Sequence, residues 1–340
     1  MKWQFLSKAI LLSLLISLGG QNVFATNKEH TFIGEQLLEM SPSYVKKGQM
    51  ILSNSPEVVH DNGILYHEEV HGEGRLLFHH LNGTSTSKRF IAMIHNVQPA
   101  PMKLKLKKCE AVGPTKNILF AGKKLLDNYF QNQWSEETLI IPPLSEAILY
   151  DSIGHPWKSQ EVLTGIVDYE LDGRGELFTA CMEASDPVER IKTLSYLPKD
   201  HHPRGTFYVL EETYTVHLPS FGAYYMCLEQ EEDWAIGKDG ITQEITMNKG
   251  NYGIMYHVTI QAEADTQIYI VPRAGVFKGV IKWEDGTLCA IERTHYFKHC
   301  KEPVLLGTVK EHTARTLSYM LPNGSAAPVW LQFHTIENNE

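Results

Sequence analysis

Cysteine is scarce in this chain, and its five cysteines are widely spaced. No Cys-x-x-Cys pair occurs, which excludes zinc and redox sites of that kind. The odd count and the wide spacing also exclude a disulfide-dense scaffold, because such frameworks rely on several paired cysteines in a short chain. Cys289 and Cys300 are close enough in sequence to bridge neighbouring strands, and they are the disulfide candidate.

An excess of positive charge is also missing. The 340 residues include 31 Lys and Arg against 40 Asp and Glu, which gives a formal net charge of -9. A nucleic-acid-binding protein needs a basic field that displaces counterions from phosphates, so no nucleic-acid partner is expected. Hydrophobic residues make up 43% of the chain and charged residues 21%, a composition typical of globular proteins.

Long hydrophobic runs are confined to the N-terminus. Lys2 and Lys8 precede an apolar run at 9–18, and Val23-Phe24-Ala25 offers small residues for cleavage. The run of about ten residues is too short for a bilayer, which needs roughly 20. Residues 1–25 are therefore predicted to be a signal peptide cleaved after Ala25. The mature chain is expected to be secreted or wall-associated, without a transmembrane span; a retained N-terminal anchor is the alternative.

The remaining chain reads mainly as β-structure. Residues 26–48 are interpreted as a polar lead-in segment, with an amphipathic patch that suggests a single helix. From residue 49 onward, strand-length runs such as 63–70 and 88–97 are separated by turn signals about every ten residues. This pattern predicts two antiparallel β-sandwich-like domains, at 49–200 and 204–337, joined by the polar segment 199–203. A joined pair that packs as one unit is the alternative.

One segment departs from the strand pattern. Between residues 117 and 134 the apolar positions fall mostly at three- and four-residue spacing and form one helical stripe. We expect a helix here, packed on the first domain. Its aromatic residues are interpreted as core and not as a cofactor site.

The histidines do not form a recognisable metal site in the sequence. His79 and His80 are adjacent, so on a strand they point to opposite faces. His80 could approach His71 or His95 across neighbouring strands, but no third ligand is visible. The linker pair His201-His202 is a weaker candidate, and His295 and His299 lack the Glu of HExxH. No metal and no cofactor are therefore expected.

Catalytic motifs are absent as well. The sequence has no GxSxG elbow, no P-loop and no GxGxxG after a strand. Carboxylates are plentiful, but a glycosidase needs two of them at a set separation, and no pair can be identified from sequence. An acidic run at 229–233 is most simply a solvated turn.

Aromatic residues near predicted turns are the better functional candidates. Trp157, Trp234 and the pair Asn251-Tyr252 lie where a β-sandwich displays its binding loops. Exposed rings with nearby polar groups would suit a sugar ring or a peptide. The alternative is that these rings plug the ends of the sandwich. The predicted ligand-binding set is Trp157, Trp234, Asn251, Tyr252, His80 and Asn82.

Several runs of the sequence resemble a group of secreted proteins of Gram-positive bacilli labelled copper amine oxidase-like. They include ILSNSPEVV (51–59), GRLLFHHLNGT (74–84), IPPLSEAILYDSIGHPW (141–157), GNYGIMYHVTI (250–260) and LPNGSAAPVWL (321–331). The resemblance extends over roughly residues 50–335 and implies an exported chain. The small N-terminal repeat module from which that label derives has no counterpart in residues 26–48.

The resemblance does not imply amine oxidase activity. That enzyme forms a quinone from a tyrosine in an Asn-Tyr-Asp/Glu setting beside copper, whereas here Gly253 follows Asn251-Tyr252. Copper also needs an HxH pair and a distant histidine, and no HxH triplet occurs in the chain. We therefore expect an exported, non-catalytic envelope protein that binds a wall glycan, a peptide or a surface protein. A hydrolase of envelope polymers is the alternative, and a copper amine oxidase is the least favoured.

Overall fold

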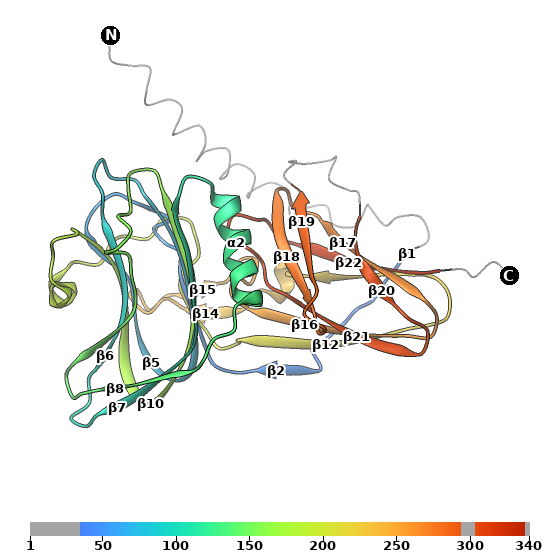
Figure 1. Cartoon of the computed structure of the whole chain (residues 1–340), viewed down its shortest axis with the longest axis horizontal. Helices are drawn as coiled ribbons and strands as arrows, with labels where there is room; N and C mark the ends of the chain where they lie inside the picture. The colour runs from blue at the N-terminus through green and yellow to red at the C-terminus, as the bar shows by residue number, and fades with distance from the viewer. Residues whose placement is uncertain (1–34, 294–302, 337–340) are drawn as a thin grey trace, which may run out of the picture.

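The structure, a computed structural model, describes residues 35–293 and 303–336. Strands dominate these ranges, so the mainly β fold expected from the sequence is confirmed. Figure 1 shows two β-rich halves side by side, with helix α2 (Ile118–Gln131) between them. The predicted signal peptide, residues 26–34 of the lead-in and Cys300 lie outside the described residues.

The first half is built from one eleven-stranded sheet. Its strands are β3 (Gln49–Ser53), β4 (Val58–Val59), β5 (Gly63–Asn82), β6 (Arg89–Asn96), β7 (Met102–Thr115), β8 (Glu137–Ile141), β9 (Glu146–Asp151), β10 (Val162–Met182), β11 (Gly205–Phe207), β14 (Ile236–Lys238) and β15 (Ile245–Met247).

Two long strands hold this sheet together. β5 and β10 pair along nearly their whole length, with a register shift between Leu171 and Arg174. Before the shift β10 also pairs with β7, and after it β10 pairs with β6. Residues from both stretches, such as Leu76 and Leu65 of β5, belong to the same buried cluster. The sheet therefore folds over its own hydrophobic core, as two layers of a sandwich do.

The second half is a sandwich of a six-stranded and a five-stranded sheet. The six-stranded sheet contains β2 (Tyr44–Lys46), β12 (Glu211–Leu218), β16 (Met255–Ala262), β18 (Phe277–Trp283), β19 (Leu288–Arg293) and β21 (Thr313–Tyr319). The five-stranded sheet contains β1 (Glu35–Leu37), β13 (Ala223–Leu228), β17 (Thr266–Pro272), β20 (Val304–Val309) and β22 (Val329–Thr335). Short 3-10 helices occur at Val188–Thr193 and Glu231–Asp233.

The strand pairing crosses the predicted domain boundary in both directions. β1 and β2, from the lead-in segment, pair with β13 and β12 of the second half. In the opposite direction β11, from beyond residue 204, pairs with β3 of the first half and carries β14 and β15 with it. The helix suggested for the lead-in is wrong for its described part, because strand pairing with distant segments determines its conformation there.

The sheets are not purely antiparallel, which corrects one detail of the prediction. β3 and β4 run parallel to β5, β12 runs parallel to β16, and β1 runs parallel to β13. Parallel pairs need long crossover connections. Such pairs join segments far apart in the chain, and an alternation pattern read along the sequence carries no information about them.

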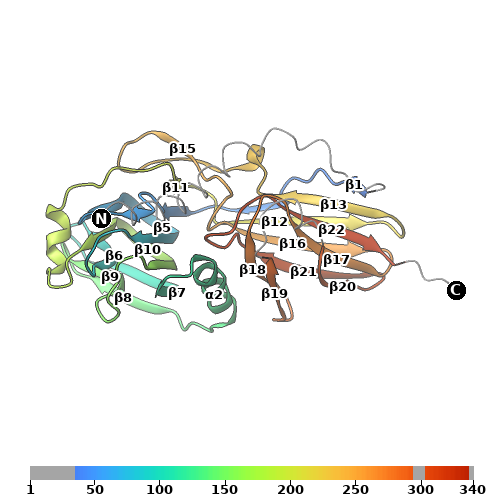
Figure 2. The ribbon, with the colours of Figure 1, turned by 90° about the horizontal axis from the view of Figure 1, so that it is seen from above.

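Helix α2 begins and ends close to the predicted positions. Asn117 caps its N-terminus by accepting a hydrogen bond from the Phe120 amide at 3.0 Å. Its buried residues Leu125, Leu126 and Phe130 belong to a hydrophobic core shared by both halves. The helix contacts β7 and β10 on one side and β18 on the other, as Figure 2 also shows. It therefore lies at the junction of the halves and not on the first one alone.

Candidate functional site

The outer face of the six-stranded sheet is polar. Residues alternate between buried apolar and accessible polar positions along β12, β16 and β21, as expected for a sheet with one face on the core. The register sets the accessible side chains in three rows. We call this surface the polar sheet face; its rows are Thr213–His257–Ser318, Thr215–Thr259–Thr316 and His217–Gln261–Ala314.

Hydrogen bonds between neighbouring strands organise the polar sheet face. The Thr259 and Thr316 hydroxyls lie 2.9 Å apart, and His257 Nδ1 lies 2.9 Å from the Ser318 hydroxyl. These contacts pair four of the six side chains of the first two rows within the protein. The third row carries exposed side chains, so its polar groups are available to a ligand.

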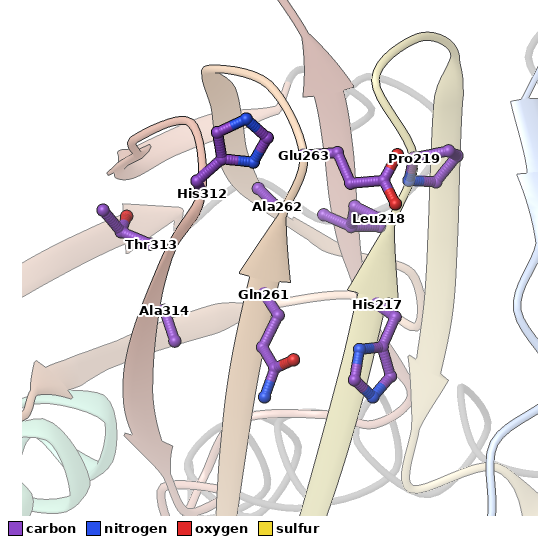
Figure 3. Close-up of a pocket in the computed structure, with 9 residues that line it drawn as sticks. All are labelled: His217, Leu218, Pro219, Gln261, Ala262, Glu263, His312, Thr313 and Ala314. Atoms are coloured by element: carbon purple, nitrogen blue, oxygen red, sulfur yellow. The ribbon is translucent and has the colours of Figure 1, made fainter.

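A pocket of about 540 Å³ opens at this third row. Figure 3 shows His217 and Gln261 side by side on neighbouring strands, with Glu263 and His312 on the adjoining loops. All four side chains are exposed. Two imidazoles, a carboxamide and a carboxylate provide hydrogen-bond donors and acceptors, while Leu218, Pro219 and Ala262 add a small apolar wall. The pocket is chemically suited to a polar, hydroxyl- or amide-rich ligand.

A carboxylate next to the first row, an imidazole and a hydroxyl of that row form a chain of contacts. His257 Nε2 lies 3.4 Å from Glu211 Oε2, while its Nδ1 contacts Ser318. The hydrogen bond with His257 holds the pKa of Glu211 down at about 2, although partial burial acts in the opposite direction. The order of groups matches a nucleophile, a base and an orienting acid.

The position of Ser318 argues against acyl transfer. β21 lies between β16 and β18 at this residue, and Ser318 is in register with His257 and Lys282. The backbone donors around it face paired strands, whereas an oxyanion hole needs donors aimed at the reacting carbonyl. The Glu211–His257–Ser318 chain is therefore best explained as a cross-strand polar network.

A buried ion-pair network joins the halves beside this row. Arg75, only 4% exposed, donates from Nε to Asp168 at 2.6 Å and from Nη2 to the Tyr129 hydroxyl at 2.9 Å. Its Nη1 donates to the carbonyl oxygens of Leu210 and Gly253 across the junction. Burial disfavours the charge, but Asp168 outweighs it and the net shift of the Arg75 pKa is upward. Every group is internally satisfied, which indicates a structural role.

The predicted loop aromatics are not a binding platform. Trp157 is fully buried, stands edge-on to Phe90, and donates its indole N–H to the Glu161 carbonyl at 2.8 Å. Trp234 is 8% exposed and donates to the Glu229 carbonyl at 3.1 Å. The exposed-ring interpretation is wrong for both, because the short turns that carry them fold back onto the core.

The polar members of the predicted set are also internal. Asn251 is 1% exposed and bridges the Ala235 amide, the Asp233 carbonyl and the Tyr256 hydroxyl. The Tyr252 hydroxyl donates to the Ser325 carbonyl at 2.7 Å. Asn251 holds a turn with a positive φ of 51°, where asparagine is tolerated. This pair therefore stabilises a loop.

His80 and Asn82 are buried as well. His80 contacts the Ser53 hydroxyl and the Pro56 carbonyl, each at 2.9 Å, and burial lowers its pKa to about 4. Asn82 donates to the Thr86 and Trp157 carbonyls and accepts from Thr84. Neither side chain reaches the surface, so the structure does not bring the predicted set together as a ligand site.

An HExxH spacing occurs at His67-Glu68-Glu69-Val70-His71, and the structure shows why it is not a protease site. That motif places two histidines on one face of a helix. Here it lies on β5, where four residues span about 13 Å, so the two imidazoles cannot bind one ion. The His67 ring stacks on Phe178 instead, with centroids 4.2 Å apart.

The linker offers a different group of potential metal ligands. Ligand atoms of Asp200, His201 and His202 all lie within 4.8 Å of one another. The disulfide candidate stays a prediction, because Cys300 lies outside the described residues. Cys289 is half-buried, and its thiol lies 3.1 Å from the Leu306 carbonyl.

The pocket residues were missed in the sequence because they come from distant segments. His217, Gln261 and His312 are separated by about 40 to 50 residues in each step. The alternation T-Y-T-V-H-L at 213–218 predicts a polar strand face, and this is the one signal that the sequence offers. The parallel pairing that brings β12 beside β16 leaves no signal in the sequence.

Comparisons with known proteins give no family. No family model and no curated protein matches the chain. Among solved structures it is similar, at 8% identity, to the CUB1-EGF-CUB2 domains of rat MASP-1, covering 82% of this chain and 99% of that one with a TM-score of 0.22. It is also similar to tripeptidyl peptidase 2, at 8% identity, covering 88% of this chain and 24% of that one with a TM-score of 0.17. The similarity to Lac15 from a marine microbial metagenome is at 9% identity, covering 88% of this chain and 65% of that one with a TM-score of 0.16. These similarities are too weak to carry an argument. In the described part of the chain, no helix has the length and apolar character needed to cross a membrane.

Proposed function

We propose that this protein is an exported, non-catalytic binding protein of the bacterial envelope or extracellular space. Its ligand is a polar polymer of the wall, a glycan or its peptide, which enters the pocket at the end of the polar sheet face. The N-terminal segment and the resemblance to secreted proteins support export. The exposed third row supports the binding role.

The observation that carries the proposal is the contrast between the rows of the polar sheet face. Thr259, Thr316, His257 and Ser318 bond to one another across strands. His217 and Gln261, one row further, stand exposed beside a pocket. A flat sheet rigidly positions such groups, which limits the entropy lost when a ligand binds.

The ligand chemistry follows from the lining. Gln261 supplies one donor group and one acceptor, Glu263 accepts, and each imidazole can do either. Vicinal hydroxyls and N-acetyl amides present matching donors and acceptors. A purely apolar ligand would leave these groups unpaired and is disfavoured.

The experiment is binding to purified cell wall and to a glycan array by the full chain and by a Gln261→Ala and His217→Ala double variant. We expect the double variant to bind at least tenfold more weakly. Gln36→Ala, an equivalent exposed glutamine on β1 of the other sheet, is the matched control and should bind like the native chain. Blank wall and array results, or equal binding by the double variant, would contradict the proposal.

A hydrolase is the second candidate, favoured by the Glu211–His257–Ser318 contacts. It predicts that soluble fragments are released from wall material and that Ser318→Ala abolishes the release. If the protein only binds, neither the native chain nor Ser318→Ala releases fragments, and Ser318→Ala still binds wall material. The two functions are therefore separated by one comparison.

A further inference from the structure

The segment 199–203, predicted as the linker, leads from β10 to β11 within the first half and holds a carboxylate and two imidazoles close together. Asp200, His201 and His202 offer ligand atoms that all lie within 4.8 Å of one another. His201 is exposed, while Asp200 and His202 are half-buried. The two imidazole rings are tilted by 38° to each other, with centroids 4.0 Å apart.

The carboxylate of Asp200 is fixed by three hydrogen-bond donors. Its Oδ1 accepts from the Ser55 hydroxyl and from the His202 amide, each at 2.9 Å. Its Oδ2 accepts from the Glu57 amide at 2.8 Å. A carboxylate oxygen has two lone pairs, so Oδ2 retains one for a further partner.

The His202 ring lies between two carboxylates. Its Nε2 is 3.0 Å from Glu57 Oε2, and its Nδ1 is 3.1 Å from Asp200 Oδ2. The Nδ1 atom is buried, yet among the described residues no partner meets it with hydrogen-bond geometry. When Nε2–H is donated to Glu57, the Nδ1 lone pair faces the free lone pair of Asp200. Two such acceptors side by side repel unless a proton or a cation lies between them.

The segment around this cluster is rigidly anchored. Arg204, two residues further on, forms a buried ion pair with Asp239 at 2.9 Å. It also donates to the carbonyl oxygens of Ser55, Leu65 and Leu197. The loop that carries the three ligand residues is thus held from both sides, as a preorganised ion site requires.

We propose that Asp200, His201 and His202 bind one divalent transition-metal ion, with Glu57 orienting the His202 ring. Two bonds of about 2.1 Å, from His202 Nδ1 and Asp200 Oδ2, would span the observed 3.1 Å at an angle of roughly 95°. The exposed His201 ring, whose ligand atom lies within 4.8 Å of the other two, supplies the third ligand. A ligating histidine that donates its other N–H to a carboxylate is the usual arrangement at metal sites.

The ligand set selects the class of ion. Two imidazoles and one carboxylate suit Zn²⁺ and its neighbours, whereas Mg²⁺ and Ca²⁺ prefer sites made of oxygen ligands. Three protein ligands leave a coordination position for water or for a group of a partner. The site is independent of the pocket on the polar sheet face, and either can fail without the other.

The test is Zn²⁺ binding by the untagged, metal-stripped chain, measured by competition with a chromophoric chelator and by metal content after dialysis. We expect one Zn²⁺ per chain. His201→Ala should weaken binding at least tenfold; its exposed side chain makes this variant expected to fold. Asp200→Asn should weaken binding too, but it also alters the loop.

Two matched histidine variants serve as controls. His155→Ala, in an exposed loop, and His217→Ala, in the pocket, should both retain one tightly bound Zn²⁺. Cobalt-substituted native protein should show visible ligand-field absorption that His201→Ala lacks. Absence of stoichiometric Zn²⁺, equal affinity in His201→Ala, or loss of the ion in His217→Ala would overturn the proposal.

Discussion

Glu229 shows at the residue scale how a single buried group couples folding to pH. It is 1% exposed, and the Tyr319 hydroxyl donates to its Oε2 at 2.9 Å. No described residue hydrogen-bonds to its Oε1. Burial raises the pKa of this carboxyl well above its ordinary value, so the folded chain holds a proton that the unfolded chain releases.

The sign of the effect follows from that difference. The contribution of Glu229 to stability is fully present below the pKa that its carboxyl has in the unfolded chain. It is lost as the pH rises through the higher pKa of the same carboxyl in the folded chain. Glu229→Gln keeps an acceptor for Tyr319 without the ionisation. We expect it to raise the free energy of unfolding by about 1 to 3 kcal/mol near pH 8 and by less near pH 4. Urea unfolding at both pH values measures this, and an equal effect at both would refute it.

Trp157 separates a core role from a ligand role. Because it is fully buried, Trp157→Ala is expected to lower the free energy of unfolding by about 3 to 5 kcal/mol. Trp134→Ala, at a residue 43% exposed, should cost less than about 1 kcal/mol. The more conservative Trp157→Phe should fold and bind wall material like the native chain. Loss of binding by a folded Trp157→Phe would restore the loop-aromatic hypothesis.

These residues also show what a sequence can and cannot predict about a site. Trp157 follows a turn signal, but whether its ring faces solvent depends on how the turn folds back. His201 and His202 are a weak metal candidate in the sequence because they lie in a polar linker. In the structure both imidazoles approach Asp200, which the linker composition does not reveal.

At the scale of elements, α2 depends on one close approach. A Cβ added to Gly122 would lie 2.0 Å from the Asn323 carbonyl oxygen, a backbone atom that cannot easily yield. Intrinsic propensity favours alanine over glycine in a helix by about 1 kcal/mol. The clash outweighs this preference, so the helix must pack here through glycine.

Gly122→Ala is therefore expected to lower the free energy of unfolding by about 2 kcal/mol, although helix propensity by itself favours alanine. Gly154→Ala is the matched control, because a Cβ added there meets open space, and its effect should stay within about 0.5 kcal/mol. Thermal and urea unfolding of both variants would measure the difference. A stabilised Gly122→Ala would mean that α2 does not approach Asn323 this closely.

The existence of α2 could be predicted, but its partners could not. Its periodic apolar residues and the Asn117 cap are local signals. Its contacts with β18 join residues more than 100 positions apart. The same limit applies to β12 and β16, whose parallel pairing creates the third row of the polar sheet face.

At the scale of the whole molecule, the two halves share one hydrophobic core. Met50, Leu52 and Leu77 of the first half belong to the same cluster as Ile260 and Phe333 of the second. Strands are also exchanged across the predicted boundary. The mainly β build could be predicted from the sequence. Whether the halves pack as one unit stays open there, because a linker composition says nothing about the contacts across it.

A shared core predicts one cooperative unfolding transition. Calorimetry should show a single peak whose van't Hoff and calorimetric enthalpies agree. Leu126→Ala, which truncates a buried residue of α2, should lower the midpoint of that peak without splitting it. Two separate transitions in the native chain would show that the halves fold independently.

The most direct test of the proposed function is histidine footprinting with diethyl pyrocarbonate, read by mass spectrometry, with and without saturating soluble wall fragments. We expect the fragments to protect His217 and His312, which line the pocket, and to leave the exposed His155 as reactive as before. Equal modification of His217 and His312 with and without bound fragments would contradict it.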